Sequence, residues 1–170
     1  MITPNYVQTF ALYNKWQNHS LYGAADTLSS DERLLDRGAF FKSIQATLTH
    51  ILWGDTLWLS IFDGGEKPDP QVALAGEYPS DWNTLKTDRL ATDNRFIDWG
   101  TRITQADLEG DFTWYSRTVE REITKPKTVC VAHIFNHQTH HRGQVHAMLT
   151  AAGTKPDDTD LPFIPDDYLA

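Results

Sequence analysis

Apolar residues recur at helical spacing along most of the chain, and this pattern predicts an all-α fold. Thr3 and Pro4 supply an N-cap and a first-turn proline for a helix that runs to about Leu28. Ser29 and Glu32 then match a capping box, which opens a short further turn. The N-terminal part of the chain therefore begins with one long amphipathic helix.

The second predicted helix, from Ala39 to about Asp63, is apolar around most of its circumference and should be buried on several sides. His50 lies near its middle, on a face whose other members are mostly small. Those members are Ser43, Ala46, Thr47, Gly54 and Leu57. Taken alone, His50 is more simply explained as a hydrogen-bonded core residue, but histidines further along the chain offer it a shared ion.

The segment 64–79 contains three prolines and three glycines without an apolar period, so we expect a long connection that crosses the bundle. Ser80 is a plausible N-cap for a third helix that ends near Gln105. Its charged side chains suggest a solvated face. They are Lys86, Asp88, Arg89, Asp93 and Arg95. The composition of residues 112–123, rich in aromatic and β-branched side chains, favours a small β-ribbon.

A fourth helix is predicted to follow Thr124 and Pro126 and to close at Gly153, before an acidic, proline-rich tail that we expect to be extended along the surface. Five of the seven histidines in the chain lie between His133 and Gly153. At about 100° per residue, one stripe of this helix should face the core, whereas Arg142 and His146 should point away. The stripe contains Cys130, His133, Ile134, His137, His141, Gln144, Val145 and Met148.

Histidines four residues apart on a helix can bind one metal ion together. The spacing offers two such pairs, His133 with His137 and His137 with His141, and does not choose between them. The alternative is that these are core histidines bonded to backbone or water, or members of a solvated polar face. A divalent cation is the simpler partner for several buried neutral imidazoles.

Composition limits what this site can belong to. At 170 residues with 40% hydrophobic side chains, the chain should fold as one domain over residues 1–170. A net charge of -8 argues against nucleic acid as a partner, and the single cysteine, Cys130, excludes an internal disulfide or a thiolate zinc cluster. No segment approaches the apolar length of a membrane span, and the first residues do not resemble a signal peptide. We therefore expect a cytoplasmic protein that does not bind membranes.

Several stretches together resemble the DinB (damage-inducible) and YfiT-like family, whose members are regarded as metalloenzymes. They are YNKWQN at 13–18, THILWGDTLWL at 49–59, HIFNHQTHHRGQ at 133–144 and the late AGTKPDDTDL. The resemblance covers nearly the whole chain. It implies a four-helix bundle with up-down-down-up topology, a long crossover between helices two and three, and a homodimer.

The resemblance also implies a divalent metal held by three histidines. The family's ligand on the second helix matches His50, and its pair on the last helix matches His137 and His141. His133 then becomes a neighbour that orients a ligand or lines the pocket, and His140 a residue at the rim. Zinc is the first expectation and nickel its competitor, since imidazole suits both.

Three imidazoles leave a coordination position for water or substrate, as in catalytic sites. Because the family includes transferases and isomerases that use low-molecular-weight thiols, we expect a metal-dependent transferase or hydrolase, with a thiol as a possible cofactor. The competing hypothesis is a non-catalytic metal-binding or stress-response protein whose ion fastens the second and fourth helices. The sequence indicates neither the substrate nor a catalytic residue beyond the ligands.

Overall fold

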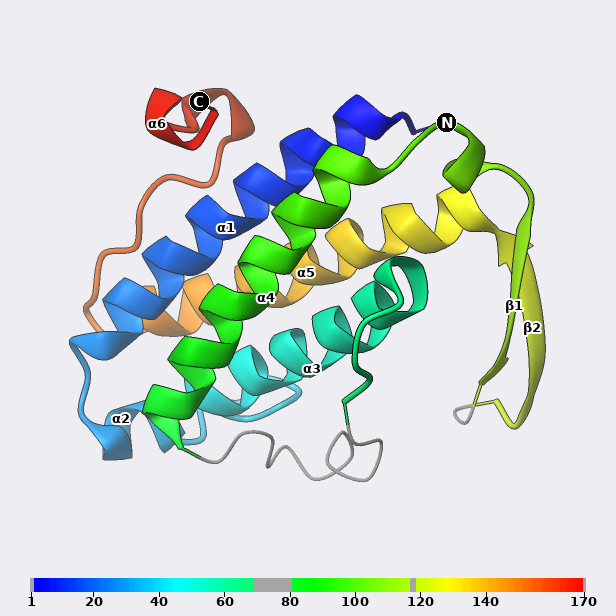
Figure 1. The fold of residues 1–170 in the computed structure, drawn as a ribbon. Coiled ribbons are helices and arrows are strands. Elements are labelled where there is room, and N and C mark those ends of the chain that lie inside the picture. The colour runs from blue at the N-terminus through cyan, green and yellow to red at the C-terminus, as the bar shows by residue number, and fades with distance from the viewer. Residues whose placement is uncertain (1, 69–80, 117–118, 170) are drawn as a thin grey trace.

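Four long helices form the body of the molecule, which the computed structural model describes except for residues 1, 69–80, 117–118 and 170. They are α1 (Pro4–Asp26), α3 (Ile44–Asp63), α4 (Trp82–Arg102) and α5 (Lys127–Ala151), with the short α2 (Ser30–Leu34) between the first two. In Figure 1, α1 and α5 run in one direction, and α3 and α4 run in the other. This arrangement confirms the predicted up-down-down-up bundle.

Each long helix packs against two others. Both α1 and α3 contact α4 and α5, so the four helices occupy the corners of a square. Because α3 and α4 are parallel, the end of α3 and the start of α4 lie at opposite ends of the bundle (Figure 1). The predicted crossover, residues 64–79, lies mostly outside the described residues.

Side-chain caps fix where the first helices begin. The Tyr6 amide donates to Thr3 Oγ1 at 3.2 Å, and Ser29 with Glu32 forms the predicted capping box at the start of α2. The second long helix was predicted from Ala39 but begins at Ile44. Ser43 caps it by accepting from the Ala46 amide at 3.1 Å.

The residues just before α3 form a tight turn instead of a helical one. Ala39 and Lys42 form an isolated bridge, and Lys42 has a φ of 66°, a left-handed conformation that a right-handed helix cannot contain. Phe41 is consequently outside the helix. That displacement matters for the histidine site described below.

The bounds of the third and fourth long helices differ slightly from the predicted ones. Asp81 caps α4 through the Thr84 amide at 2.7 Å, and the predicted cap, Ser80, lies outside the described residues. The helix ends at Arg102 instead of Gln105, because Ile103 is extended. The last helix closes as expected, with Gly153 at a φ of 84° directly after the C-cap.

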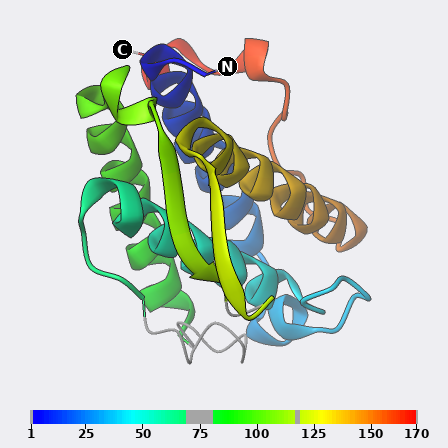
Figure 2. The same ribbon diagram turned by 90° about the vertical axis from the view of Figure 1, so that its right-hand side faces the viewer.

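A β-hairpin precedes α5, as the composition of residues 112–123 predicts. Its strands β1 (Asp111–Ser116) and β2 (Arg121–Pro126) are antiparallel, with Thr113 opposite Thr124. Figure 2 shows the hairpin at the end of the bundle where α5 begins. Trp114 packs edge-on against Trp58 of α3, with ring centroids 5.6 Å apart. The hairpin thus covers the C-terminal part of α3.

The C-terminal segment was predicted to be an extended tail, but it is partly helical and bonded to α1. It contains the 3-10 turn Leu161–Phe163 and α6 (Asp166–Leu169). The Tyr13 hydroxyl donates to the Thr159 carbonyl at 2.6 Å, and the Gln17 amide donates to the Asp158 carbonyl at 2.8 Å. These side chains of α1 satisfy backbone carbonyls of the segment and hold it in place.

Charged residues inside the bundle are the main departure from the predicted pattern. Arg89 and Asp93 were expected on a solvated face of α4, and Arg142 was expected to point away from the core, but all three are buried. Arg89 donates to Asp55 Oδ2 of α3 at 2.6 Å and pairs with Asp93 at 2.9 Å. The buried carboxylates and guanidiniums neutralise one another, which makes their burial tolerable.

The buried apolar side chains form two clusters. One includes Leu48, Leu52 and Leu149, and the other includes Leu59, Phe96 and Phe135. None of the helices that the structure describes has the length and hydropathy needed to cross a lipid bilayer.

Candidate metal centre

Three imidazoles converge between α3 and α5. His50 comes from α3, and His137 and His141 come from successive turns of α5. One ring nitrogen of each lies within 4.8 Å of the others, and the Nε2 atoms of His50 and His137 are 3.1 Å apart. The structure therefore brings together the three residues that the family resemblance selects.

The local sequence of α3 makes this approach possible. Gly54 is one turn after His50, and a Cβ atom added to it would lie only 3.1 Å from Cε1 of His137. The missing side chain at Gly54 lets the His137 ring lie directly over α3. This agrees with the predicted small face around His50.

Phe41 and Gln144 are contacts of the cluster for which the sequence predicted no role. The Phe41 ring stacks on His50 with centroids 3.9 Å apart and an interplanar angle of 22°. Gln144 Oε1 lies 2.8 Å from Nδ1 of His141. The spacing of three residues on α5 is a signal that would have identified Gln144, whereas Phe41 depends on the turn before α3.

The Gln144 contact fixes the tautomer of His141. An amide oxygen can only accept a hydrogen bond, so Nδ1 of His141 has to carry the proton, and its Nε2 then carries a lone pair. Such an outer hydrogen bond is typical of metal-ligating histidines. Gln144 is placed to orient His141 in this way.

Electrostatics keep the cluster uncharged at neutral pH. Burial lowers the pKa of His137 to about 3, with the neighbouring histidines adding to the effect. Burial and His141 together lower the pKa of His50 to about 4. Burial also lowers the pKa of His141, although the Gln144 hydrogen bond opposes the shift. Neutral imidazoles are the form that binds a metal ion.

The other histidines of α5 lie around the cluster. The His133 ring packs edge-on against Trp58 at 5.3 Å and is 5.6 Å from the His137 ring, so it lines the side of the cluster nearest the hairpin. His140 is exposed beside His141, consistent with the predicted rim position. His146 lies outside the cluster, as its position on the helix predicts.

A cavity of about 440 Å³ opens next to two of the three imidazoles. Its lining consists of Phe40, Phe41, His50, His140, His141 and Gln144. Phe40 is 82% exposed and packs edge-on against Phe41, so it provides an aromatic wall at the mouth. A small molecule could reach His50 and His141 through this opening.

The donor set fits a divalent cation. Two bonds of about 2.0–2.1 Å at a tetrahedral angle separate ligand nitrogens by about 3.3 Å, close to the 3.1 Å between His50 and His137. Within the described residues, the converging group contains three imidazoles and neither a carboxylate nor a thiolate. Nitrogen ligands alone suit zinc, nickel and copper better than calcium or magnesium.

Comparison with known proteins identifies the family of this chain. The model of the DinB family matches residues 1–167. The chain belongs to the DinB family. A curated relative, Protein DinB of Bacillus subtilis (strain 168), is 24% identical over 157 residues, which is 87% of this chain and 87% of the relative. The resemblance expected from the histidine, tryptophan and glycine motifs is thereby confirmed.

Beneath the cluster lies the buried polar layer of the bundle, which the sequence did not predict. Gln138 follows His137 and is fully buried, and its amide donates to Asp55 Oδ1 at 2.9 Å. Asp55 follows Gly54 and accepts from Arg89 through its other oxygen. The residues next to His137 and Gly54 are thus tied together inside the bundle, which restrains the relative positions of α3 and α5.

Proposed function

We propose that this protein is a metal-dependent enzyme that binds one divalent cation through His50, His137 and His141. The observation that carries the proposal is the convergence of three uncharged imidazoles next to an open cavity. A structural site is normally closed by four protein ligands, whereas three ligands and an accessible cavity are typical of catalysis. Zinc is the favoured ion and nickel the alternative.

A bound cation would supply a Lewis acid that lowers the pKa of a coordinated thiol or water molecule. The residues of the chain would hold and orient it. Gln144 keeps the Nδ1 proton on His141, Phe41 fixes the ring plane of His50, and Gly54 gives His137 its room. Phe40 and Phe41 offer an apolar wall to the molecule that enters. The proposed chemistry is transfer to or from a low-molecular-weight thiol, or a hydrolysis.

The alternative is a non-catalytic metal-binding or stress-response protein in which the ion fastens α3 to α5. The His50–His137 contact supports this alternative as well, because it joins residues 87 positions apart in the chain. The two proposals differ in whether a second molecule can reach the ion. The cavity lined by His50 and His141 favours the enzyme.

The ligand assignment is tested by metal analysis of purified variants. His137→Ala and His141→Ala should each lose the ion under conditions in which the unsubstituted protein retains it. His146→Ala is the matched control, because it removes an imidazole from the same helix outside the cluster. Equal metal content in the three variants would refute the three-histidine site.

Access to the ion is tested with cobalt in place of the natural metal. An added thiol that coordinates cobalt as the thiolate produces a charge-transfer band in the near ultraviolet, which imidazole and water ligands lack. The enzyme hypothesis predicts this band with at least one common cellular thiol, and release of a proton on binding. A folded, cobalt-loaded protein that shows no band with any thiol would favour the non-catalytic alternative.

We also propose that the protein is a homodimer. Trp53, Leu57 and Ile61 follow one another at every fourth residue of α3, and all three are only half-buried in the single chain. A second copy would cover this apolar stripe. Sedimentation should then give about twice the chain mass of 19.4 kDa, and a monomer at micromolar concentration would refute the proposal.

A further inference from the structure

A second cavity lies between α1, α5 and the C-terminal segment. Its volume is about 300 Å³, at the lower end of the range for small-molecule sites. It shares no lining residue with the cavity next to the histidine cluster. Among the described residues, its lining contains a single charged side chain, that of Arg142, and no carboxylate.

Arg142 is a buried cation without an anionic partner. It is only 4% exposed, and its Nη1 donates to the amide oxygen of Asn14. Within the described part of the chain, no carboxylate oxygen lies within 4.0 Å of its nitrogens. Its Nε and Nη2 atoms have no protein acceptor either, and neither is completely enclosed. Buried charges in native proteins are normally paired.

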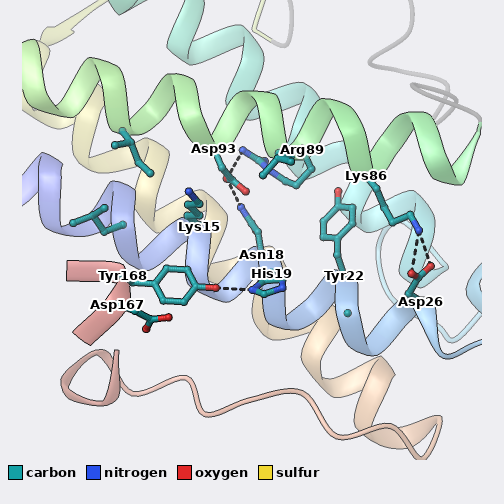
Figure 3. Close-up of a pocket in the computed structure, with 14 residues that line it drawn as sticks. Lys15, Asn18, His19, Tyr22, Asp26, Lys86, Arg89, Asp93, Asp167 and Tyr168 are labelled. Carbon is teal, nitrogen blue, oxygen red and sulfur yellow. Dashed lines mark hydrogen bonds and ion pairs between the residues drawn. The ribbon is translucent and has the colours of Figure 1, made fainter. Parts of the chain in front are cut away.

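Arg89 shows how the same bundle pairs another buried arginine. Arg89 is 3% exposed and lies 2.6 Å from Asp55 and 2.9 Å from Asp93. Figure 3 shows the Arg89–Asp93 pair at the edge of the cavity between α1 and α4. The two buried carboxylates near Arg142 are thus in direct contact with the other guanidinium. Arg142 has a neutral amide in their place, so an anion from outside the chain could supply its missing partner.

The other polar groups of the cavity leave few free donors. The hydroxyls of Tyr13 and Thr139 donate to backbone carbonyls at 2.6 Å and 2.9 Å, so their hydrogens are already used. A neutral imidazole has one N–H, which His146 can offer beside Arg142. The available donors are therefore those that an oxyanion would need.

The acidic C-terminal segment restricts the charge of that anion. Burial raises the pKa of the Tyr13 phenol, and Asp160 and Asp158 add to the shift, so their carboxylates lie near the cavity. Both residues are exposed, and water screens their repulsion of a single charge. An anion with two charges is repelled more strongly. Leu21 and Ala147 offer apolar contact to the rest of a ligand.

We propose that this cavity binds a small organic carboxylate with a single negative charge and an apolar body. The two carboxylate oxygens accept from Nε and Nη2 of Arg142, the paired geometry that a guanidinium offers to a planar anion. His146 donates a further hydrogen bond, and the apolar body lies against Leu21 and Ala147. The site is separate from the proposed metal centre and does not depend on it.

The test uses benzoate and benzamide, because the two planar probes share a ring and differ in charge. Binding is followed by two-dimensional amide NMR of the full chain, at millimolar probe concentration and constant ionic strength. Benzoate should cause saturable shifts in α1, α5 and residues 157–160. It should bind about tenfold more tightly than benzamide, since a hydrogen bond to a charged group is worth about 1.5–3 kcal/mol. Inorganic phosphate should bind more weakly than benzoate.

The role of the guanidinium is tested with Arg142→Met. Replacing a buried ion by an apolar side chain of similar length is often tolerated, and the amide spectrum verifies the fold. Benzoate should then bind no more tightly than benzamide. Arg102→Met is the control, because it removes an exposed arginine that does not line this cavity and should leave both affinities unchanged.

A further variant fills the cavity and leaves Arg142 in place. Gly143 lines the cavity, and a Cβ atom added to it would meet nothing within 4 Å, so Gly143→Leu should abolish binding of both probes. Gly23→Leu is the control, because Gly23 is also an exposed helical glycine with open space around its Cβ position but lies outside this cavity. Both changes introduce a better helix former and should leave the fold intact.

Benzoate could instead coordinate an ion at the histidine cluster, and His137→Ala distinguishes the two sites. This variant should bind benzoate with unchanged affinity, because His137 does not line the cavity that contains Arg142. Loss of benzoate binding in His137→Ala would overturn the proposal. So would the absence of saturable shifts, equal affinity for benzoate and benzamide, tighter binding of phosphate, or undiminished binding by Gly143→Leu.

Discussion

The two sides of the bundle bury polar side chains in opposite ways. Between α3 and α5, a buried His141 and the half-buried His50 and His137 are neutral rings whose lone pairs converge. Between α4 and its neighbours, Arg89 and Asp55 are buried as full charges that compensate each other at 2.6 Å. A neutral donor cluster can accept a cation, whereas a compensated ion pair has no remaining charge to offer. The comparison explains why we assign the ion to the first side.

The largest expected effect comes from removing one partner of the buried Arg89–Asp55 ion pair. Asp55→Ala removes the partner of Arg89 and Gln138 at once and leaves a buried guanidinium without its closest carboxylate. We expect the free energy of unfolding to fall by about 3–5 kcal/mol, measured by urea denaturation. Lys86→Ala is the control, since its pair with Asp26 is partly exposed and should contribute no more than about 1 kcal/mol. Equal losses in the two variants would contradict the role given to burial.

A bound cation should stabilise the histidine cluster, because neutral imidazoles do not repel it. A ligand present at about a hundredfold excess over its dissociation constant stabilises the native state by about 2.7 kcal/mol. Stripping zinc or nickel with a chelator should therefore lower the melting temperature of the native protein. The His137→Ala variant should show no such response, since one of its three ligands is missing. An unchanged melting temperature in the native protein after verified metal loss would argue against an ion joining α3 to α5.

A smaller change tests whether His141 depends on its outer hydrogen bond. Gln144→Ala removes the acceptor of the Nδ1 proton without removing a ligand. Loss of such a partner typically weakens metal affinity by 10- to 100-fold, or about 1.4–2.7 kcal/mol. Competition with a chromophoric chelator measures this change. His140→Ala should alter the affinity far less, because its exposed ring is outside the converging group.

The smallest expected effect is the decrease in stability of the metal-free protein as the pH falls. Burial holds the pKa of His137 at about 3 in the native state, whereas an unfolded chain would give about 6.5. The unfolded state then binds more protons as the pH falls, so native stability has to decrease. Between about pH 7 and pH 6, this histidine alone should account for about 0.7 kcal/mol. Urea titrations at the two pH values should show a smaller decrease for His137→Gln.

The helical pattern of the sequence was sufficient for most of the fold. Caps such as Thr3 and the Ser29–Glu32 box act within four residues, so their signals are local and were predicted correctly. The start of α3 was predicted wrongly, because Lys42 adopts a left-handed conformation that the local sequence does not indicate. Phe41 consequently reaches His50 from a turn that the sequence assigned to the helix.

The sequence by itself determined which residue types were available for chemistry, and the family motif determined which histidines to choose. His137 and His141 are four residues apart on one helix, so their proximity follows from helix geometry alone. Only the tertiary structure decided that Arg89, Asp93 and Arg142 are buried. When each helix is considered alone, their charges predict exposure to solvent. Burial becomes tolerable only because other helices supply partners: Asp55 pairs with Arg89, and Asn14 hydrogen-bonds to Asp93 and Arg142. Pairing between distant segments leaves no periodic trace in the chain, and for that reason it had to be read from the packed bundle.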